Sequence, residues 1–212
     1  LVFGTAKRGI DIPSVNTAFE SSRPGIFIAG ELGGMGLVRN AIEQGKQAVD
    51  NICQAIAQSD GPSSPSALDL IIVGAGPAGI ASALAAKAQG LRYLVIEQDS
   101  LGGTVAHFPR KKLVMTAPVD LPLVGKMNFR ETSKEDLLGF WKDIVSRQSL
   151  EIRFQERLEG LQDTDNGFTV QTSQGSYETQ SILLCLGRRG SPRKLDVPGE
   201  DSSKVVYRLD DP

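Results

Sequence analysis

The feature that most constrains the fold of this chain is a GxGxxG motif, GAGPAG, at residues 74–79. The residues before it, 68–73, form a short apolar run that is typical of a buried parallel strand. The residues after it, 78–89, are rich in alanine and are followed by Gly90, as expected of a helix that ends at a glycine. With a second apolar strand at 93–97, this order predicts a βαβ unit.

The spacing of the motif predicts a dinucleotide site. Gly74 allows a tight turn, Gly76 lets the backbone approach a pyrophosphate, and Gly79 lets the helix pack closely on the strand. The N–H groups at the helix N-terminus attract the phosphates. Glu97 ends the second strand, where a carboxylate accepts both ribose hydroxyls of an adenosine and disfavours the 2′-phosphate of NADP. The competing interpretation is a glycine-rich turn with an incidental surface Glu97.

Two other glycine-containing segments could approach a ligand. Residues 25–31, GIFIAGE, are expected to form a buried strand ending in a glycine and a carboxylate. They lead through the glycine-rich residues 32–36 into a helix from about Leu37 to Ala57, an arrangement that suits a polyol or a pyrophosphate and equally an ordinary αβ turn. The Gly-Gly-Thr sequence at 102–104 would let the chain pass close to a bulky planar group.

The remaining elements complete an α/β pattern. An irregular stretch is expected from 98 to about 130, followed by a helix that Thr132 or Ser133 caps and that runs to about Gln148. Three alternating segments near 150–162, 167–173 and 175–180 predict an antiparallel meander, and residues 181–187 predict a return to the buried parallel sheet.

Composition excludes several classes of function. The chain has 212 residues, 25 acidic and 23 basic, for a net charge of −2, which favours neither nucleic acid nor a membrane surface. No apolar run approaches the roughly 20 residues of a membrane span. Two distant cysteines and one histidine exclude a zinc ribbon, a His-rich metal site, a CxxC pair and a disulfide scaffold. We therefore expect no metal and a cytoplasmic location.

Taken together, these motifs resemble a known family. GAGPAG with Glu97, then GGT, the meander and CLGRRGSPRKLDVPGE at 185–200 are similar to the FAD-binding half of thioredoxin-reductase-like pyridine nucleotide oxidoreductases. PGIFIAGELGGMGLVRNAIEQG at 24–45 resembles the closing FAD motif of that family, with Glu31 where aspartate is more usual. The resemblance implies an α/β, Rossmann-like FAD-binding domain with a parallel sheet and an antiparallel β-meander, its closing segment N-terminal in the chain.

The resemblance also implies a set of FAD-binding residues. Gly74, Gly76, Pro77, Ala78 and Gly79 would contact the pyrophosphate, Glu97 the adenosine ribose, and the backbone of Leu158 the adenine. Gly30 and Glu31 would meet the pyrophosphate–ribityl region, Gly103 and Thr104 the flavin end, and Asn40 and Ala41 the isoalloxazine ring. Gly187, at the end of the returning strand, is also expected to bind the cofactor. No catalytic residue is assigned.

The order of segments departs from the family. The closing motif usually comes last, after an inserted NAD(P)H domain, whereas here it comes first. We therefore divide the chain into a closing FAD segment at 1–58, a linker at 59–67, the N-terminal half of an FAD domain at 68–205, and the start of an NAD(P)H-binding domain at 206–212. The first segment is either the tail of an upstream module or a permuted half of the same domain, and it is expected to dock on the sheet through its strand and helix.

These observations favour the FAD-binding portion of a flavin oxidoreductase that takes hydride from NAD(P)H in the full-length protein. Val105 stands where a related group of disulfide reductases carries a redox cysteine, and Cys185 is expected to be a core residue, so no dithiol relay is predicted. His107 is expected to be a partly exposed loop residue. A flavin monooxygenase, an electron-transfer module serving an acceptor protein or domain, and a flavin-free scaffold remain alternatives; a homodimer is left open.

Overall fold

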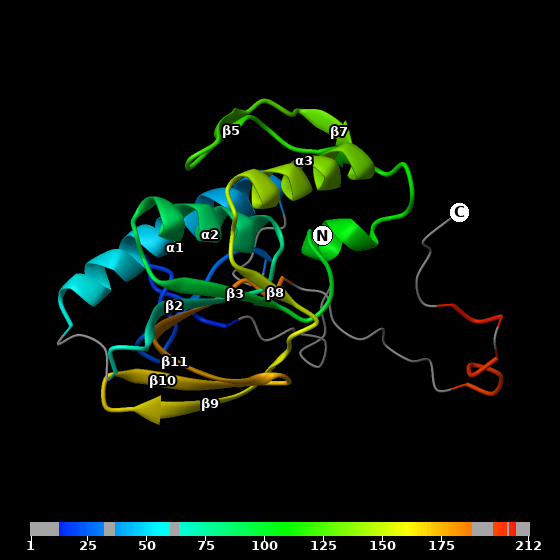
Figure 1. Cartoon of the computed structure of the whole chain (residues 1–212). Helices are drawn as coiled ribbons and strands as arrows, with labels where there is room; N and C mark the ends of the chain where they lie inside the picture. Colours follow the sequence, from blue (N-terminus) through cyan, green and yellow to red (C-terminus); the bar gives the residue numbers. More distant parts are fainter. Residues whose placement is uncertain (1–12, 32–36, 60–63, 188–196, 203, 207–212) are drawn as a thin grey trace.

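The computed structural model of the chain describes residues 13–31, 37–59, 64–187, 197–202 and 204–206. Helices cover one face of a central sheet and a meander covers the other (Figure 1). The glycine-rich residues 32–36, the central part of the motif at 185–200, and the last residues of the chain lie outside the described part.

The predicted βαβ unit is confirmed. It consists of β2 (Leu68–Val73), α2 (Pro77–Ala88) and β3 (Tyr93–Glu97). Strands β2 and β3 are parallel. The parallel part of the sheet runs in the order β8-β3-β2-β11-β1, where β8 is Ile152–Phe154, β11 is Gly175–Leu184 and β1 is Ile26–Ile28. Helix α2 ends at Ala88 with Gln89 as its C-cap, and Gly90 follows with a φ of +73°, a conformation that favours glycine.

Alternate side chains at the end of β2 enter two different cores, which explains why residues 70–73 are all apolar. Leu70 and Ile72 face the helices, whereas Ile71 and Val73 face the meander. All four side chains are buried because both faces of a parallel sheet are covered.

Two predictions about the second half of the chain are wrong in detail. The segment expected at 150–162 is two strands, β8 (Ile152–Phe154), parallel to β3, and β9 (Leu158–Thr164). They are separated at Gln155, whose φ is +59° without the glycine that would have marked the break. The segments expected at 175–180 and 181–187 are one strand, β11 (Gly175–Leu184). It pairs with β10 (Gly167–Thr172) in its first half and with the parallel sheet in its second, so its burial pattern changes without a turn.

The stretch expected to be irregular contains short ordered elements. These are the 3₁₀ helix η2 (Gly103–His107) and the strands β4 (Leu113–Met115), β5 (Val119–Leu121), β6 (Gly125–Met127) and β7 (Glu131–Ser133). The strands pair as β4–β7 and β5–β6 and pack over the helices (Figure 1). Each strand is too short to produce a readable alternation, so the prediction of irregular structure is wrong in part. His107 accordingly lies on a short helix, not in a loop.

The expected helix after this stretch is α3 (Lys134–Arg147). Of the two possible caps, Ser133 is the one used, because its hydroxyl accepts a hydrogen bond from the backbone N–H of Asp136. Trp141 and Ile144 lie on the buried face of the helix, as predicted from their spacing.

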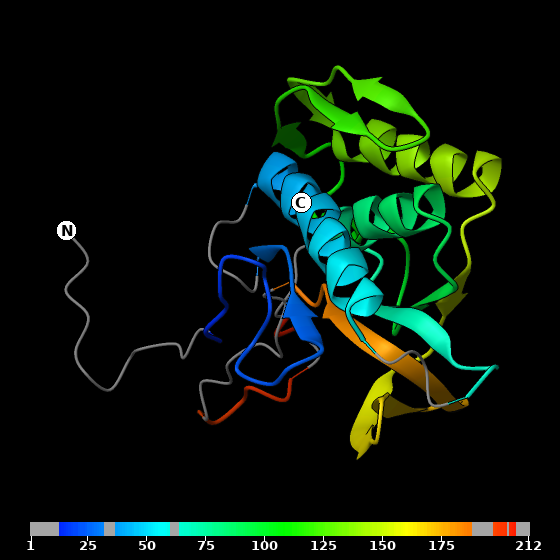
Figure 2. The same cartoon turned by 90° about the vertical axis from the view of Figure 1, so that its left-hand side faces the viewer.

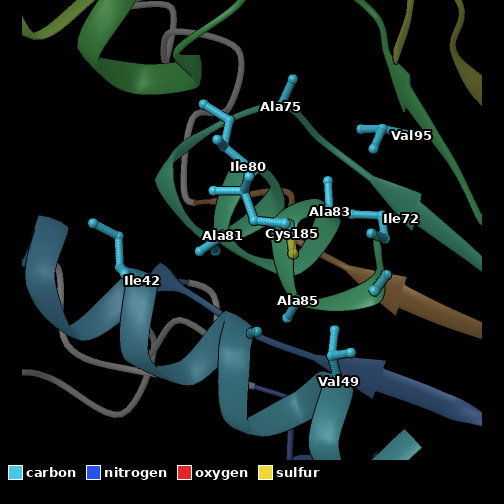
Figure 3. Close-up of a cluster of buried hydrophobic side chains, with 14 of the residues drawn as sticks. Ile42, Val49, Ile72, Ala75, Ile80, Ala81, Ala83, Ala85, Val95 and Cys185 are labelled. Carbon is cyan, nitrogen blue, oxygen red and sulfur yellow. The ribbon is translucent and has the colours of Figure 1, made fainter. Parts of the chain in front are cut away.

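The N-terminal part of the chain, residues 1–58, is called the front segment here, and its described strand and helix pack on the same sheet. Strand β1 (Ile26–Ile28) pairs in parallel with the second half of β11, and α1 (Val38–Ala57) crosses α2 (Figure 2). Figure 3 shows that the side chains of Ile42 and Val49 lie on the face of α1 that is turned toward α2. Between them, Gly45 sits so close to α2 that a Cβ there would lie 2.5 Å from the carbonyl oxygen of Ala78.

Candidate functional site

A pocket of about 290 Å³ lies at the carboxyl ends of four parallel strands. Gly30 follows β1, Gly74 follows β2, Glu97 ends β3, and Gly187 follows β11; all four line the pocket. Ligands of open parallel sheets bind at this edge, where the loops after the strands converge. The fold therefore places the predicted dinucleotide residues where such a ligand would bind.

The three glycines of the GAGPAG motif differ in what requires them. A Cβ at Gly79 would lie 1.8 Å from the carbonyl oxygen of Gly74, so this position is closed by helix–strand packing. Gly74 has a φ of +112°, and a Cβ there would lie 2.5 Å from the carbonyl oxygen of Cys185. Gly76 has an ordinary φ of −80°, and among the described residues its Cβ would meet only the Cα of Gly103, at 3.8 Å. The folded chain itself thus requires glycine at two of these positions and leaves space at Gly76, on the pocket wall.

Two helix N-termini meet at this pocket without side-chain caps. Helix α2 begins after Gly76 with Pro77, and α1 begins after Leu37; neither has a side-chain cap or an acidic residue in its first turn. The first N–H groups of a helix have no partner within it and carry partial positive charge. Their convergence gives the middle of the pocket the character of an anion site.

Glu97 is held in place by the glycine loop. It is 8% exposed, its Oε2 accepts a hydrogen bond from the N–H of Ala75 at 2.8 Å, and its Oε1 accepts one from the N–H of Asp99 at 2.8 Å. The carboxylate is therefore fixed at the rim of the pocket, with lone pairs left for two further donors.

Cys185 lines the pocket, and its thiol is expected to be unreactive. Burial raises the pKa of its thiol to about 12, although a hydrogen bond with Ser82 opposes the rise. A thiol with this pKa is protonated at neutral pH and is a poor nucleophile. The nearby η2 presents Val105 to the pocket, so the structure brings no cysteine pair together there.

The pocket gathers nearly all of the residues predicted to bind the cofactor. Those lining it are Gly30, Glu31, Ala41, Gly74, Gly76, Pro77, Ala78, Glu97, Gly103, Thr104, Leu158 and Gly187. Asn40 does not line it, because the turn of α1 that faces the pocket is formed by Leu37, Val38 and Ala41. Gly79 does not line it either, because it faces β2.

Sequence reasoning missed several lining residues. Most are apolar and carry no motif, such as Val38, Ile96 and Phe108. Glu156 and Arg157 were also missed, because the segment that contains them read as one continuous strand. A turn between β8 and β9 could have been suspected only from the run of polar residues at 155–157.

Two other residues considered as candidates, His107 and Trp141, lie outside the pocket lining. His107 lies on η2 with its Nε2 3.0 Å from a carboxylate oxygen of Asp99. Trp141 is fully buried in the core. Within the described residues, no group of three or more His, Cys, Asp or Glu side chains is arranged to hold a metal ion. No helix in that part of the chain has the length and apolarity needed to cross a membrane.

Comparisons with known proteins agree with this geometry. Residues 71–212 match the family model described as pyridine nucleotide-disulphide oxidoreductase. Bacilliredoxin reductase Bdr of Bacillus subtilis is 27% identical over 142 residues, covering 65% of this chain and 44% of that protein. A ferredoxin–NADP reductase of Streptococcus thermophilus is 32% identical over 147 residues, covering 66% of this chain and 42% of its own. The chain thus spans less than half the length of these relatives.

The solved structures support the fold. Bacillithiol disulfide reductase Bdr from Staphylococcus aureus superimposes with a TM-score of 0.59 at 22% identity, over 68% of this chain and 46% of that one. The family match begins within β2, so the front segment lies before the matched residues although it lines the same pocket. The family model, the fold and the glycine-rich pocket agree: the chain belongs to the pyridine nucleotide-disulphide oxidoreductase family.

Proposed function

We propose that this chain is the FAD-binding portion of an FAD-dependent NAD(P)H oxidoreductase. The observation that carries the proposal is Gly76: the fold leaves room for a side chain there, so the residue serves the close approach of a ligand to the N-terminus of α2. A pyrophosphate is the group that this position and the two uncapped helices suit.

A dinucleotide fits the arrangement along the pocket. Glu97 suits the ribose of an adenosine on one side of the pyrophosphate position. On the other side, Gly103 and Ala41 leave a wall of small residues that suits a planar ring. Bound FAD would supply hydride and electron transfer, while the residues of the chain bind and orient it. The names of the relatives, reductases that use NADP or act on bacilliredoxin, support NAD(P)H as the hydride donor of the full-length protein.

The surroundings of the cysteines favour chemistry without a dithiol relay. Cys185 is buried with a raised pKa, and Cys53 lies on α1, away from the pocket lining. The electrons of the flavin would then go to an acceptor protein or domain, and the protein would work in the cytoplasm as a monomer or a homodimer. A flavin monooxygenase would use the same FAD loop; substrate-stimulated oxygen uptake by the full-length protein distinguishes it.

We also propose that the front segment, 1–58, completes this FAD site in permuted order. Strand β1 occupies the sheet edge beside β11, and Gly30, Glu31 and Ala41 form part of the pocket wall. Residues 59–67 are then a linker, 68–205 the first half of the FAD domain, and 206–212 the start of a nicotinamide-binding domain.

Identification of the copurifying nucleotide tests the proposal. The purified chain is denatured, and the released compound is identified by chromatography and mass spectrometry. We expect close to one equivalent of FAD per chain. A chain that lacks residues 1–60 is expected to retain no FAD. Recovery of NAD alone, or of no nucleotide after incubation with FAD, would contradict the flavin assignment; equal FAD content without residues 1–60 would contradict the permuted site.

A further inference from the structure

The loop between β8 and β9 carries a buried acid that no part of the proposed function uses. Glu156 is 1% exposed, its neighbours Arg157 and Leu158 line the pocket with it, and its backbone is hydrogen-bonded to that of Glu97. Building a carboxylate into an interior costs several kcal/mol unless its oxygens receive hydrogen bonds. Its presence beside the pocket therefore needs an explanation.

The carboxylate ties the loop to the meander. Its Oε1 accepts hydrogen bonds from the hydroxyl of Thr172 at 2.6 Å and from the phenol of Tyr177 at 2.8 Å. Its Oε2 is buried and has no hydrogen-bond partner among the described residues. The partners lie on β10 and β11, so one side chain on the pocket loop holds two strands of the meander.

The backbone of the same loop is strained and is fixed on both sides. Gln155 has a φ of +59°, which a residue other than glycine rarely adopts. The N–H of Glu156 donates to the carbonyl oxygen of Glu97 at 3.0 Å. Arg157 exchanges two hydrogen bonds with Ser173, one from its N–H to the hydroxyl at 3.0 Å and one from the N–H of Ser173 to its carbonyl oxygen at 2.9 Å.

We propose that Glu156 is a positioning residue for the adenosine half of the bound dinucleotide. This inference rests on the proposed function, in which Glu97 binds the ribose, because residues 156–158 form the pocket wall next to Glu97. A base at that wall meets the backbone of the loop, and its affinity depends on where that backbone lies. Glu156 fixes the backbone by anchoring it to Thr172 and Tyr177, so it acts through the loop, because both of its side-chain hydrogen bonds go to the meander.

Binding of the two halves of FAD to the whole chain tests this role. Affinities for ADP and FMN are measured by their competition with added FAD for the apoprotein, and the melting temperature of each variant is recorded. Glu156→Ala is expected to weaken ADP roughly tenfold or more and to leave FMN within about twofold. Glu156→Gln keeps an oxygen that accepts both hydrogen bonds and is expected to retain ADP affinity within about threefold.

Two further variants keep the inference falsifiable. Tyr177→Phe removes one donor from the far side of the anchor, so it is expected to weaken ADP selectively even if Glu156→Ala does not fold. Thr179→Val removes a buried hydroxyl of β11 whose partner is the carbonyl oxygen of Ser181; it is the matched control and should leave ADP unchanged.

The outcomes separate the two proposals. An unmutated chain that binds neither FAD nor ADP overturns the proposed function and the inference with it. An unmutated chain that binds both, with Glu156→Ala and Tyr177→Phe lowering ADP and FMN affinity equally or lowering only the melting temperature, overturns the inference alone.

Discussion

Replacing Gly45 with alanine tests how closely the front segment is packed on the domain. The new Cβ would lie 2.5 Å from the carbonyl oxygen of Ala78 and 2.7 Å from the hydroxyl of Ser82. The first of these atoms belongs to the backbone of α2, so α1 and α2 must separate by roughly 1 Å. Such overpacking costs about 1–3 kcal/mol. Against it stands a gain of about 1 kcal/mol, because alanine favours the helix over glycine.

Gly139→Ala in α3 is the matched control, since a Cβ there meets no atom of the described residues within 4 Å. Both substitutions gain the same helix propensity, so the difference between them isolates the contact with α2. We expect Gly45→Ala to be less stable than Gly139→Ala by about 1–3 kcal/mol, a gap in Tm of roughly 2–12 °C. Thermal unfolding measures the gap, and absorbance at 450 nm measures the flavin retained, which should fall only in Gly45→Ala. Equal shifts in Tm for the two variants would refute the reasoning.

Three further predictions concern the pocket itself. Gly76→Ala is expected to keep the Tm within about 2 °C and to weaken the binding of FAD roughly tenfold or more, whereas Gly79→Ala should destabilise the fold. A titration of FAD fluorescence and a melting curve distinguish the two effects. Unchanged FAD affinity in Gly76→Ala would count against a pyrophosphate at that glycine. Glu97→Gln removes the charge of the ribose acceptor and should weaken FAD by roughly 10–100-fold while leaving FMN unchanged, as measured by calorimetry; equal losses for both ligands would show a general effect on folding. Because its pKa is about 12, Cys185 should react with a thiol reagent at pH 8 roughly 10³-fold more slowly than a free cysteine and should become reactive on unfolding; rapid labelling in the native protein would contradict the buried position.

The parts of the molecule that the sequence predicted well are those set by short-range patterns. The βαβ unit follows from two apolar runs and a glycine turn, and Glu97 follows from its place at the end of the second run. The role of Glu156 could not be predicted this way, since its partners Thr172 and Tyr177 come from strands whose pairing is set by the whole sheet. The break between β8 and β9 could not be predicted from the sequence, because the left-handed backbone of Gln155 is held by tertiary contacts and no glycine marks it.

The docking of the front segment was expected because its apolar strand and helix cannot bury their faces alone. The sequence could not show the register of β1 on β11 or the contact at Gly45, because both depend on a surface formed by residues far along the chain. Asn40 illustrates the same limit: the motif placed it at the start of the right helix, and only the rotation of α1 decides which of its residues face the pocket.

The position of β11 has a consequence for cooperativity and for aggregation. Its second half is hydrogen-bonded on both sides, to β2 and to β1, while its first half carries the meander. The amides of residues 182–184 should therefore be among the slowest to exchange with deuterium, opening only when the whole domain unfolds. Because β1 is the last strand on its side in the described part of the chain, any fluctuation that lifts it off would leave an apolar row of unpaired backbone groups on β11. The front segment thus also shields a sheet edge that would otherwise pair with another chain.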